Sequence, residues 1–146
     1  MPRQFRNVVA NWSDDVATWP YEALVACIEH GLVADWQPIF AEIRQQPWGD
    51  VARRAEQYSA SGDDSAAACL FGLAVRRARE DAERRDREAV AQRVRAAIAG
   101  SGLTAAAFAM QVGTSGSRLS TYATGRVTPS AAMMLRIERA GGSVGP

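Results

Sequence analysis

With 146 residues, of which 47% are hydrophobic, the chain can form one domain or two small ones, each with a buried core. Its formal net charge of +1 says little about partners by itself, and no apolar run approaches the length of a membrane-spanning helix. The first residues are not followed by the apolar core of a signal peptide, so we expect a cytoplasmic protein.

Residues 1–75 have the pattern of a small module of amphipathic helices. Apolar residues recur there at spacings i, i+3, i+4 and i+7, which place them on one face of a helix. Three sets have this spacing: Tyr21, Leu24, Val25 and Ile28; Trp36, Ile39, Phe40 and Ile43; and Ala66, Cys69, Leu70 and Leu73. Gly31 ends the first helix, Asp35 can cap the second, and a turn at 47–50 precedes another helix over 51–58.

This module contains all four tryptophans and both cysteines. Trp12, Trp19, Trp36 and Trp48 can fill the core of a module this small, although Trp and Tyr are also enriched at protein interfaces. We expect core packing, and a partner or dimer interface in the aromatic segment 11–22 stays open as the alternative. Cys27 and Cys69 stand among apolar neighbours, which predicts buried, reduced thiols. The sequence assigns the module no role.

A single long helix is predicted from about residue 65 to residue 99, because the stretch contains no proline. Its charged middle, residues 76–88, places opposite charges four residues apart, as in Arg76 and Glu80 or Arg79 and Glu83. A solvated connector between two domains follows from this pattern. The alternative, a coiled-coil dimer stalk, lacks an apolar seam through these residues.

The pattern becomes amphipathic again after Glu88. Val90, Val94 and Ile98 give the end of the long helix one apolar face, and the helix is expected to end at residues 100–102. The core of this second part, residues 89–141, is expected to be closed by four apolar residues of the last helix: Met133, Met134, Leu135 and Ile137. Residues 142–146 form a predicted flexible tail.

Residues 102–130 contain the caps and turn residues of two short helices that cross on a tight turn. Thr104 can cap the first helix, Gly113 stands at the turn and Ser115 can cap the second helix. The expected inner face consists of Phe108, Ala109, Val112, Leu119 and Tyr122. Gly125 ends the second helix, and the run Thr128-Pro129-Ser130 begins another behind a threonine cap. The alternative is an ordinary helical hairpin, yet caps, core and turn residues agree over nearly thirty positions.

This pattern resembles the phage repressor and Cro-like family, also called the xenobiotic-response-element type, of helix-turn-helix DNA-binding proteins. The resemblance covers roughly residues 88–141 and implies that the helix near 116–124 lies in the major groove of DNA. Carried over position by position, Ser117, Arg118 and Thr121 fall where the family reads base edges. The implied phosphate contacts are Thr104, Ser115, Ser120, Thr124 and Arg126.

Some positions depart from the family pattern. Gly116 and Ala105 stand where long polar side chains often touch DNA, so direct base contacts are expected to be few, and DNA shape or a second subunit would then supply specificity. Ile98 and Ala123 occupy the places of an Arg–Glu pair that the family often buries. Both replacements are apolar, so no buried charge is left without its partner.

The charge distribution agrees with phosphate contact in the last third of the chain. Residues 1–62 carry five arginines against eight acidic residues, a net charge of −3. Residues 100–146 carry Arg118, Arg126, Arg136 and Arg139 against Glu138 alone, a net charge of +3. Four arginines are modest support for DNA binding.

The sequence has few residues in patterns typical of catalytic or metal sites. We therefore expect no enzyme, no cofactor and no metal site. The one histidine, His30, precedes a helix-ending glycine, where it favours interaction with the last carbonyl groups of the helix. The acidic pairs Asp14-Asp15 and Asp63-Asp64 fit helix caps or solvated loops better than a carboxylate dyad.

The sequence therefore predicts an all-α protein with three parts: an N-terminal helical module, a charged connector helix and a C-terminal lambda-repressor-like domain. Its predicted function is sequence-specific binding of double-stranded DNA as a transcriptional regulator. The chief alternative is an antitoxin or adaptor whose N-terminal module binds a protein partner while the DNA domain autoregulates. A homodimer would favour half-sites about one helical turn apart, and the sequence leaves the oligomeric state open.

Overall fold

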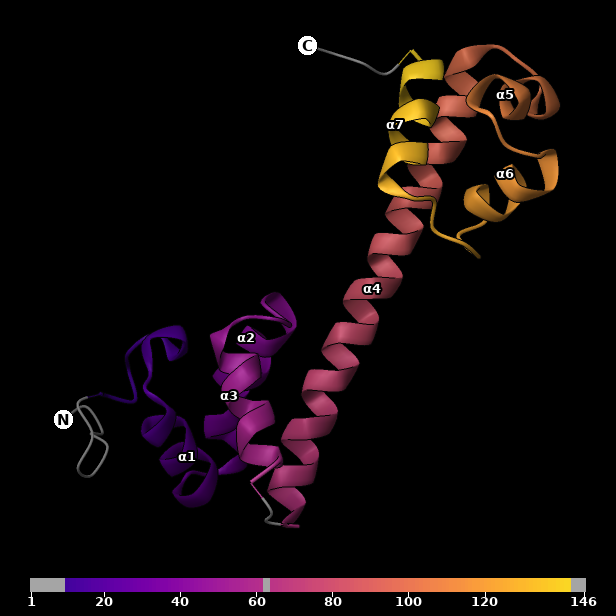
Figure 1. Cartoon of the computed structure of the whole chain (residues 1–146). Helices are drawn as coiled ribbons and strands as arrows, with labels where there is room; N and C mark the ends of the chain where they lie inside the picture. The colour runs from indigo at the N-terminus through magenta and orange to yellow at the C-terminus, as the bar shows by residue number, and fades with distance from the viewer. Residues whose placement is uncertain (1–9, 62–63, 143–146) are drawn as a thin grey trace. The chain divides into compact units, whose positions relative to one another are not determined.

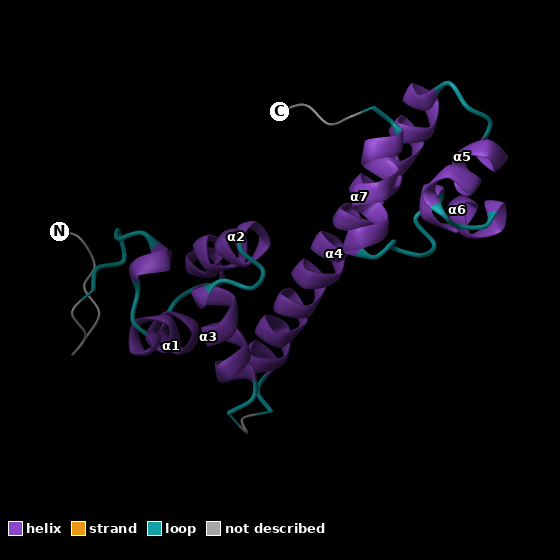
Figure 2. Ribbon diagram, turned by 45° about the horizontal axis from the view of Figure 1, so that its top comes forward, coloured by secondary structure: helices purple, strands orange, loops and turns teal. Residues whose placement is uncertain are grey.

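The computed structural model describes residues 10–61 and 64–142, and within those ranges the chain is all-helical, as predicted, without a strand. Figures 1 and 2 show α1 (Tyr21–His30), α2 (Gln37–Gln45), α3 (Asp50–Ser59), α4 (Ala66–Ser101), α5 (Ala105–Val112), α6 (Gly116–Ala123) and α7 (Ala131–Ala140). Short 3₁₀ helices cover Val16–Thr18 and Val33–Trp36. The expectations for Asp63 and for tail residues 143–146 fall outside the described residues.

The chain divides into two compact units, Met1–Ala82 and Glu83–Pro146, and the division falls inside α4. This helix is continuous from Ala66 to Ser101, as the absence of proline predicted. Each unit has its own cluster of buried apolar residues, so each can be described by itself. The predicted solvated connector, residues 76–88, is exposed only in part. From Glu83 to Ala89 the side chains are exposed, whereas Ala78 and Ala82 are buried, and Ala78 belongs to the core of the first unit.

Phe71 of α4 lies at the centre of the first unit and is fully buried. Its ring stacks on Phe40 with the centroids 4.8 Å apart, and it meets Trp36 edge-on at 5.5 Å. The same buried core contains residues from α1, α2, α3 and α4, among them Leu24, Cys27, Ile28, Ile39, Ile43, Val51, Ala55, Tyr58 and Val75. This aromatic cluster joins α2 to α4, because Phe40 belongs to α2 and Trp36 immediately precedes it.

The predicted inner face at the start of α4 is wrong by about one residue. Ala66, Cys69, Leu70 and Leu73 are exposed, whereas the buried face consists of Ala68, Phe71, Val75 and Ala78. The segment from Ala66 to Val75 is apolar on almost every side, so its periodicity does not select a face. Tertiary packing selects the face that carries Phe71, whose large ring fills the space beside Phe40.

Three smaller expectations for the first unit also need correction. Cys69 is exposed, whereas Cys27 is buried and its thiol lies 3.5 Å from the Asp35 carbonyl oxygen. Trp48 is 49% exposed and does not belong to the core. Asp35 caps no α-helix; its carboxylate accepts the N–H of Leu32 at 2.8 Å, inside the 3₁₀ turn that precedes α2. Of the predicted acidic caps, Asp15 accepts the N–H of Ala17 at the start of the first 3₁₀ helix.

The core of the second unit lies where α4, α5, α6 and α7 meet. Its buried residues are Val94, Ala97, Phe108, Ala109, Val112, Leu119, Tyr122, Met133 and Ile137. Ile98, Ala123 and Met134 are half-buried against this cluster. Leu135, which was expected in the core, is 52% exposed because it lies on the outer side of α7. The cap of α7 is Ser130, whose hydroxyl accepts the N–H of Met133 at 3.1 Å, so the predicted threonine cap at 128 is wrong by two residues.

Candidate nucleic-acid interface

Helices α5 and α6 are joined by a tight turn whose sequence explains its geometry. Thr104 Oγ1 accepts the N–H of Ala107 at 3.2 Å and begins α5. Ser115 Oγ accepts the N–H of Arg118 at 3.1 Å and begins α6. Between them Gly113 has φ of 79°, in the left-handed region that favours glycine. The two predicted caps and the predicted turn residue are confirmed.

The inner faces of α5 and α6 share one core. Phe108, Ala109 and Val112 of α5 are buried, as are Leu119 and Tyr122 of α6. The small side chain of Ala109 takes little room where the two helices contact each other. All five predicted core residues are therefore inside, which leaves the opposite side of α6 toward solvent.

The outer face of α6 is polar, and most of its hydroxyl groups are engaged within the helix. Thr121 Oγ1 donates to the Arg118 carbonyl at 2.6 Å, and Thr124 Oγ1 donates to the Ser120 carbonyl at 3.0 Å. Ser117 Oγ lies 3.2 Å from Ser115 Oγ, at hydrogen-bond distance. Short side chains held in this way keep lone pairs free as acceptors, but they have little reach.

Arg118 is the long side chain of this face. It is exposed, and its Nε donates to the hydroxyl oxygen of Tyr122 at 3.1 Å, one turn along α6. The ring of Tyr122 is buried in the core of the unit, with only 5% of its surface exposed. The exposed guanidinium group of Arg118 is thus hydrogen-bonded to a residue, Tyr122, whose ring is buried in the core.

The residues expected to contact phosphate lie at helix ends, in the middle of α6 and in the segment after α6. Thr104 and Ser115 are the caps of α5 and α6, where free backbone N–H groups of a helix N-terminus attract anions. Ser120 and Thr124 are exposed on α6, and Arg126 is exposed just after Gly125. A Cβ at Gly116 would meet no atom within 4 Å, so the first residue of α6 leaves its surroundings open.

Arg95 of α4 holds the C-terminal end of α6, which the sequence did not indicate. Its Nη1 donates to the Ala123 carbonyl at 2.6 Å, and its Nη2 donates to Glu88 Oε1 at 2.8 Å. The resemblance drew attention to Ile98 and Ala123, whose side chains are half-buried against the core. The actual charged link uses the backbone of Ala123, which no side-chain pattern can reveal.

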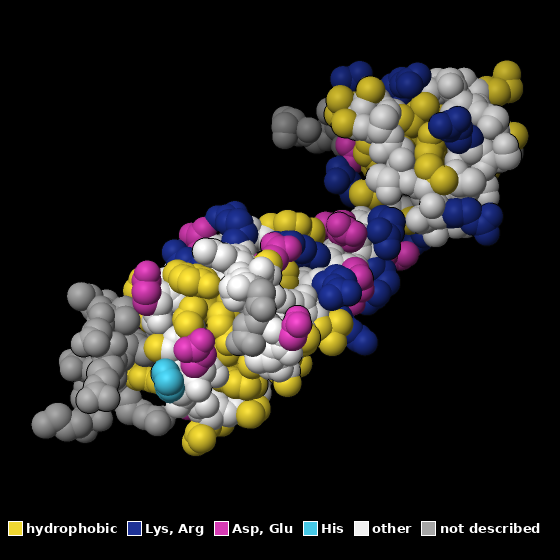
Figure 3. Space-filling view, turned by 60° about the horizontal axis from the view of Figure 1, so that its bottom comes forward, with side chains coloured by type: hydrophobic (Ala, Val, Ile, Leu, Met, Phe, Trp, Pro, Cys, Tyr) yellow, Lys and Arg dark blue, Asp and Glu magenta, His cyan; other side chains and the backbone are white. Residues whose placement is uncertain are grey.

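The one acidic residue of 100–146 is paired with an arginine from outside that range. Glu138 of α7 forms an ion pair with Arg93 of α4, so the one acidic residue of 100–146 is already neutralised. Arg136 lies beside the turn between α5 and α6, since a Cβ on Gly113 would be 3.3 Å from its Nη1. Figure 3 shows arginine side chains on the surface of the unit that carries α5, α6 and α7.

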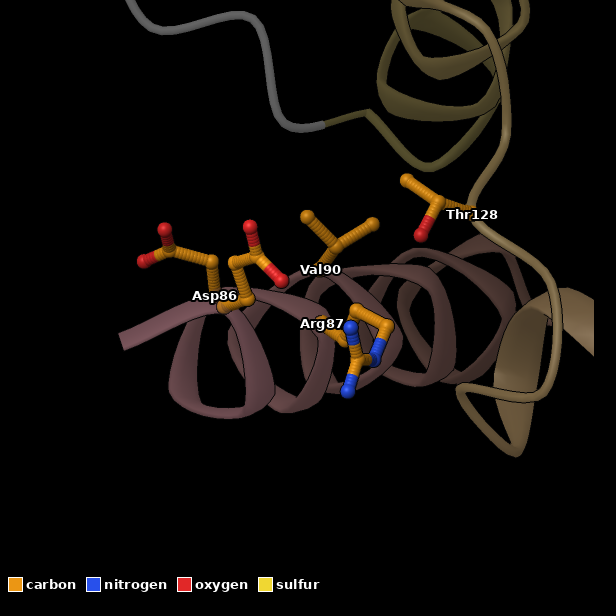
Figure 4. Close-up of a pocket in the computed structure, with 5 residues that line it drawn as sticks. Asp86, Arg87, Val90 and Thr128 are labelled. Carbon is orange, nitrogen blue, oxygen red and sulfur yellow. The ribbon is translucent and has the colours of Figure 1, made fainter. Parts of the chain in front are cut away.

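An open hollow of about 270 Å³ lies beside residues 83–90, the first turns of α4 that belong to this unit. Figure 4 shows Asp86, Arg87 and Val90 on α4 and Thr128 on the segment between α6 and α7. Glu83 also lines the hollow. The carboxylates of Glu83 and Asp86 outnumber the one guanidinium group, that of Arg87, and would repel a phosphate. The hollow is therefore not part of the candidate interface.

The first unit carries an open, mainly apolar groove of about 520 Å³. Ile28, Leu32, Val33 and Trp36 contribute apolar walls, and Glu29 is its charged residue. Leu32 and Val33 are 69% and 62% exposed, which is unusual for two adjacent aliphatic residues. The indole N–H of Trp36 donates to the Cys27 carbonyl at 3.2 Å and fixes one side of the groove.

Within the described ranges no group of three or more His, Cys, Asp or Glu residues could hold a metal ion, and no helix there is long and apolar enough to cross a membrane. His30 is exposed at the last position of α1. Comparison of the chain with protein-family models, curated proteins and solved structures found no match.

Proposed function

We propose that this protein is a sequence-specific, double-stranded DNA-binding transcriptional regulator, and that α6 enters the major groove. The observation that carries the proposal is the pair α5 and α6. Both helices are capped, they are joined through a left-handed glycine, and they are anchored on one core with the polar face of α6 outward. A major groove about 12 Å wide admits such a helix.

The contacts of α6 give its residues separate roles in this proposal. Ser117, Arg118 and Thr121 face base edges, whereas the cap residues Thr104 and Ser115, together with Ser120, Thr124 and Arg126, bind phosphates. Arg95 positions α6 through the Ala123 carbonyl. Because most hydroxyl protons of this face are used within the helix, direct readout rests on few groups.

Binding to a library of genomic DNA fragments at two salt concentrations tests the proposal. Arg118→Ala and Thr121→Ala are expected to change sequence preference, because both residues face the bases. Arg85→Ala removes the same charge from an exposed position of α4 outside the interface and serves as the matched control. If wild type binds no fragment even at low salt, or if neither substitution alters preference, the proposal fails.

A second candidate is an adaptor or antitoxin whose first unit binds a protein partner, and the groove beside Leu32 and Val33 favours it. Residues 1–62 have a net charge of −3 and Glu29 lines the groove, so the expected partner presents an apolar side chain next to basic residues. Co-expression with the product of an adjacent reading frame tests this. Leu32→Ser should weaken a complex that Leu70→Ser leaves intact, and equal effects would contradict the groove assignment.

A further inference from the structure

We propose that Arg118, oriented by Tyr122, makes the protein select a guanine in its DNA target. This inference rests on the proposed function, DNA binding through α6, and adds which base is recognised. The other outward-facing residues of α6 have a short reach. Gly116 has no side chain, and Ser117, Thr121 and Thr124 are short. Arg118 is therefore the side chain of α6 that extends furthest into a groove.

Tyr122 orients the guanidinium group of Arg118. The bond from Arg118 Nε to Tyr122 Oη occupies one edge of the guanidinium plane. Among the described residues no hydrogen bond or ion pair engages Nη1 or Nη2, so two terminal nitrogens stay available as a fork of N–H donors. Because Tyr122 is buried beside Leu119, the fork is held on a rigid support. Less side-chain freedom is then lost when it binds.

The four bases differ in the acceptors that they present to such a fork. In the major groove guanine presents two acceptors, O6 and N7, which match a guanidinium fork. Adenine presents N7 beside an amino donor, which a cation that only donates cannot satisfy. Thymine offers a single acceptor next to a methyl group, and cytosine offers a donor. A fixed fork of donors therefore favours guanine over the other three bases.

A phosphate contact is the competing role for Arg118, and the two roles have different consequences. If Arg118 contacts a phosphate, its replacement by alanine weakens binding to all sequences alike and lowers the salt dependence. If Arg118 contacts a guanine, the same substitution weakens binding mainly to the preferred site. Tyr122 in this proposal is a positioning residue, because it acts through Arg118 and touches no DNA.

The test begins with selection of binding sites from random duplexes by wild type, Arg118→Ala, Tyr122→Phe and the control Arg85→Ala. Wild type and control are expected to enrich sites with a fixed guanine. Arg118→Ala should lose the preference at that position by about tenfold to a hundredfold and keep it elsewhere. Tyr122→Phe keeps the buried ring, and its preference should fall between wild type and Arg118→Ala.

Modified bases in the selected site then identify the atoms involved. Replacement of the guanine by 7-deazaguanine removes N7 and should weaken wild type but not Arg118→Ala, whereas inosine keeps O6 and N7 and should leave wild type unchanged. Thermal unfolding of Tyr122→Phe checks that the variant is folded. If wild type binds no duplex, the proposed function itself fails. If wild type binds but Arg118→Ala changes no base preference, or if Tyr122→Phe reads guanine like wild type, this inference is overturned.

Discussion

Single residues determine the turn between α5 and α6, and two glycines there have opposite roles. Gly113 has φ of 79°, and a Cβ on it would lie 3.3 Å from Arg136 Nη1. Gly116 begins α6 with an ordinary helical backbone and open space around it. Glycine is thus required by conformation at the first position, whereas at the second it leaves room that another molecule can fill.

Gly113→Ala is expected to destabilise the second unit by about 1–2 kcal/mol, because an L side chain would be held in the left-handed region. Gly116→Ala is the matched control and should be neutral or stabilise the unit by roughly 0.5 kcal/mol, because alanine restricts the unfolded chain. Urea unfolding followed by circular dichroism measures both. Equal losses for the two variants would mean that the turn does not depend on its backbone conformation.

At the scale of elements, the register of α4 in the first unit depends on Phe71. Neighbouring apolar residues of the same helix have very different surroundings, since Phe71 is fully buried and Leu70 is 42% exposed. In the same unit Arg79 of α4 forms an ion pair with Glu56 of α3. Its Nη1 donates to Glu56 Oε1 at 2.9 Å and its Nη2 donates to Glu56 Oε2 at 3.1 Å. The sequence had suggested Glu83 as the partner of Arg79. The longer-range pair forms because α3 packs beside α4.

Phe71→Ala should lower the free energy of unfolding of the first unit by about 3–5 kcal/mol, since it leaves a cavity between Phe40 and Trp36. Leu70→Ala should cost less than about 1 kcal/mol because the side chain is largely in solvent. Tryptophan fluorescence reports on this unit alone, as all four tryptophans lie between residues 12 and 48. A larger loss for Leu70→Ala would show that the predicted register was correct after all.

At the scale of the whole molecule, charge is divided unevenly between the parts of the chain. The acidic first 62 residues and the basic last 47 give opposite local fields, although the net charge is only +1. Because Glu138 pairs with Arg93 of α4, the positive potential of residues 100–146 comes from four arginines that it does not pair: Arg118, Arg126, Arg136 and Arg139. Affinity for DNA should accordingly depend on ionic strength, and moderately so, because few arginines are involved.

Arg126→Ala should weaken binding to every DNA sequence by a similar factor, because the residue is expected to contact phosphate. The slope of log K against log salt concentration should become shallower by about 0.9, the value for one released counterion. Fluorescence anisotropy over a range of salt concentrations measures the slope, and Arg85→Ala should leave it unchanged. A change of sequence preference in Arg126→Ala would contradict the phosphate assignment.

The sequence by itself determined the all-helical class, the continuity of α4 and the local geometry of residues 104–115. These features depend on interactions within about four residues, such as a cap hydroxyl on a backbone N–H or a glycine in the left-handed region, and residue type alone encodes them. The DNA-reading role of α6 and the base that Arg118 selects stay predictions.

Only the tertiary structure decided which face of α4 is buried, that Leu135 and Trp48 lie outside the core, and that Arg95 binds the Ala123 carbonyl. A helix that is apolar nearly all round has no preferred side until another element packs on it, and a backbone carbonyl is present at every residue. The outcome in each case depended on groups that are distant in the sequence, and their contacts have no local signature.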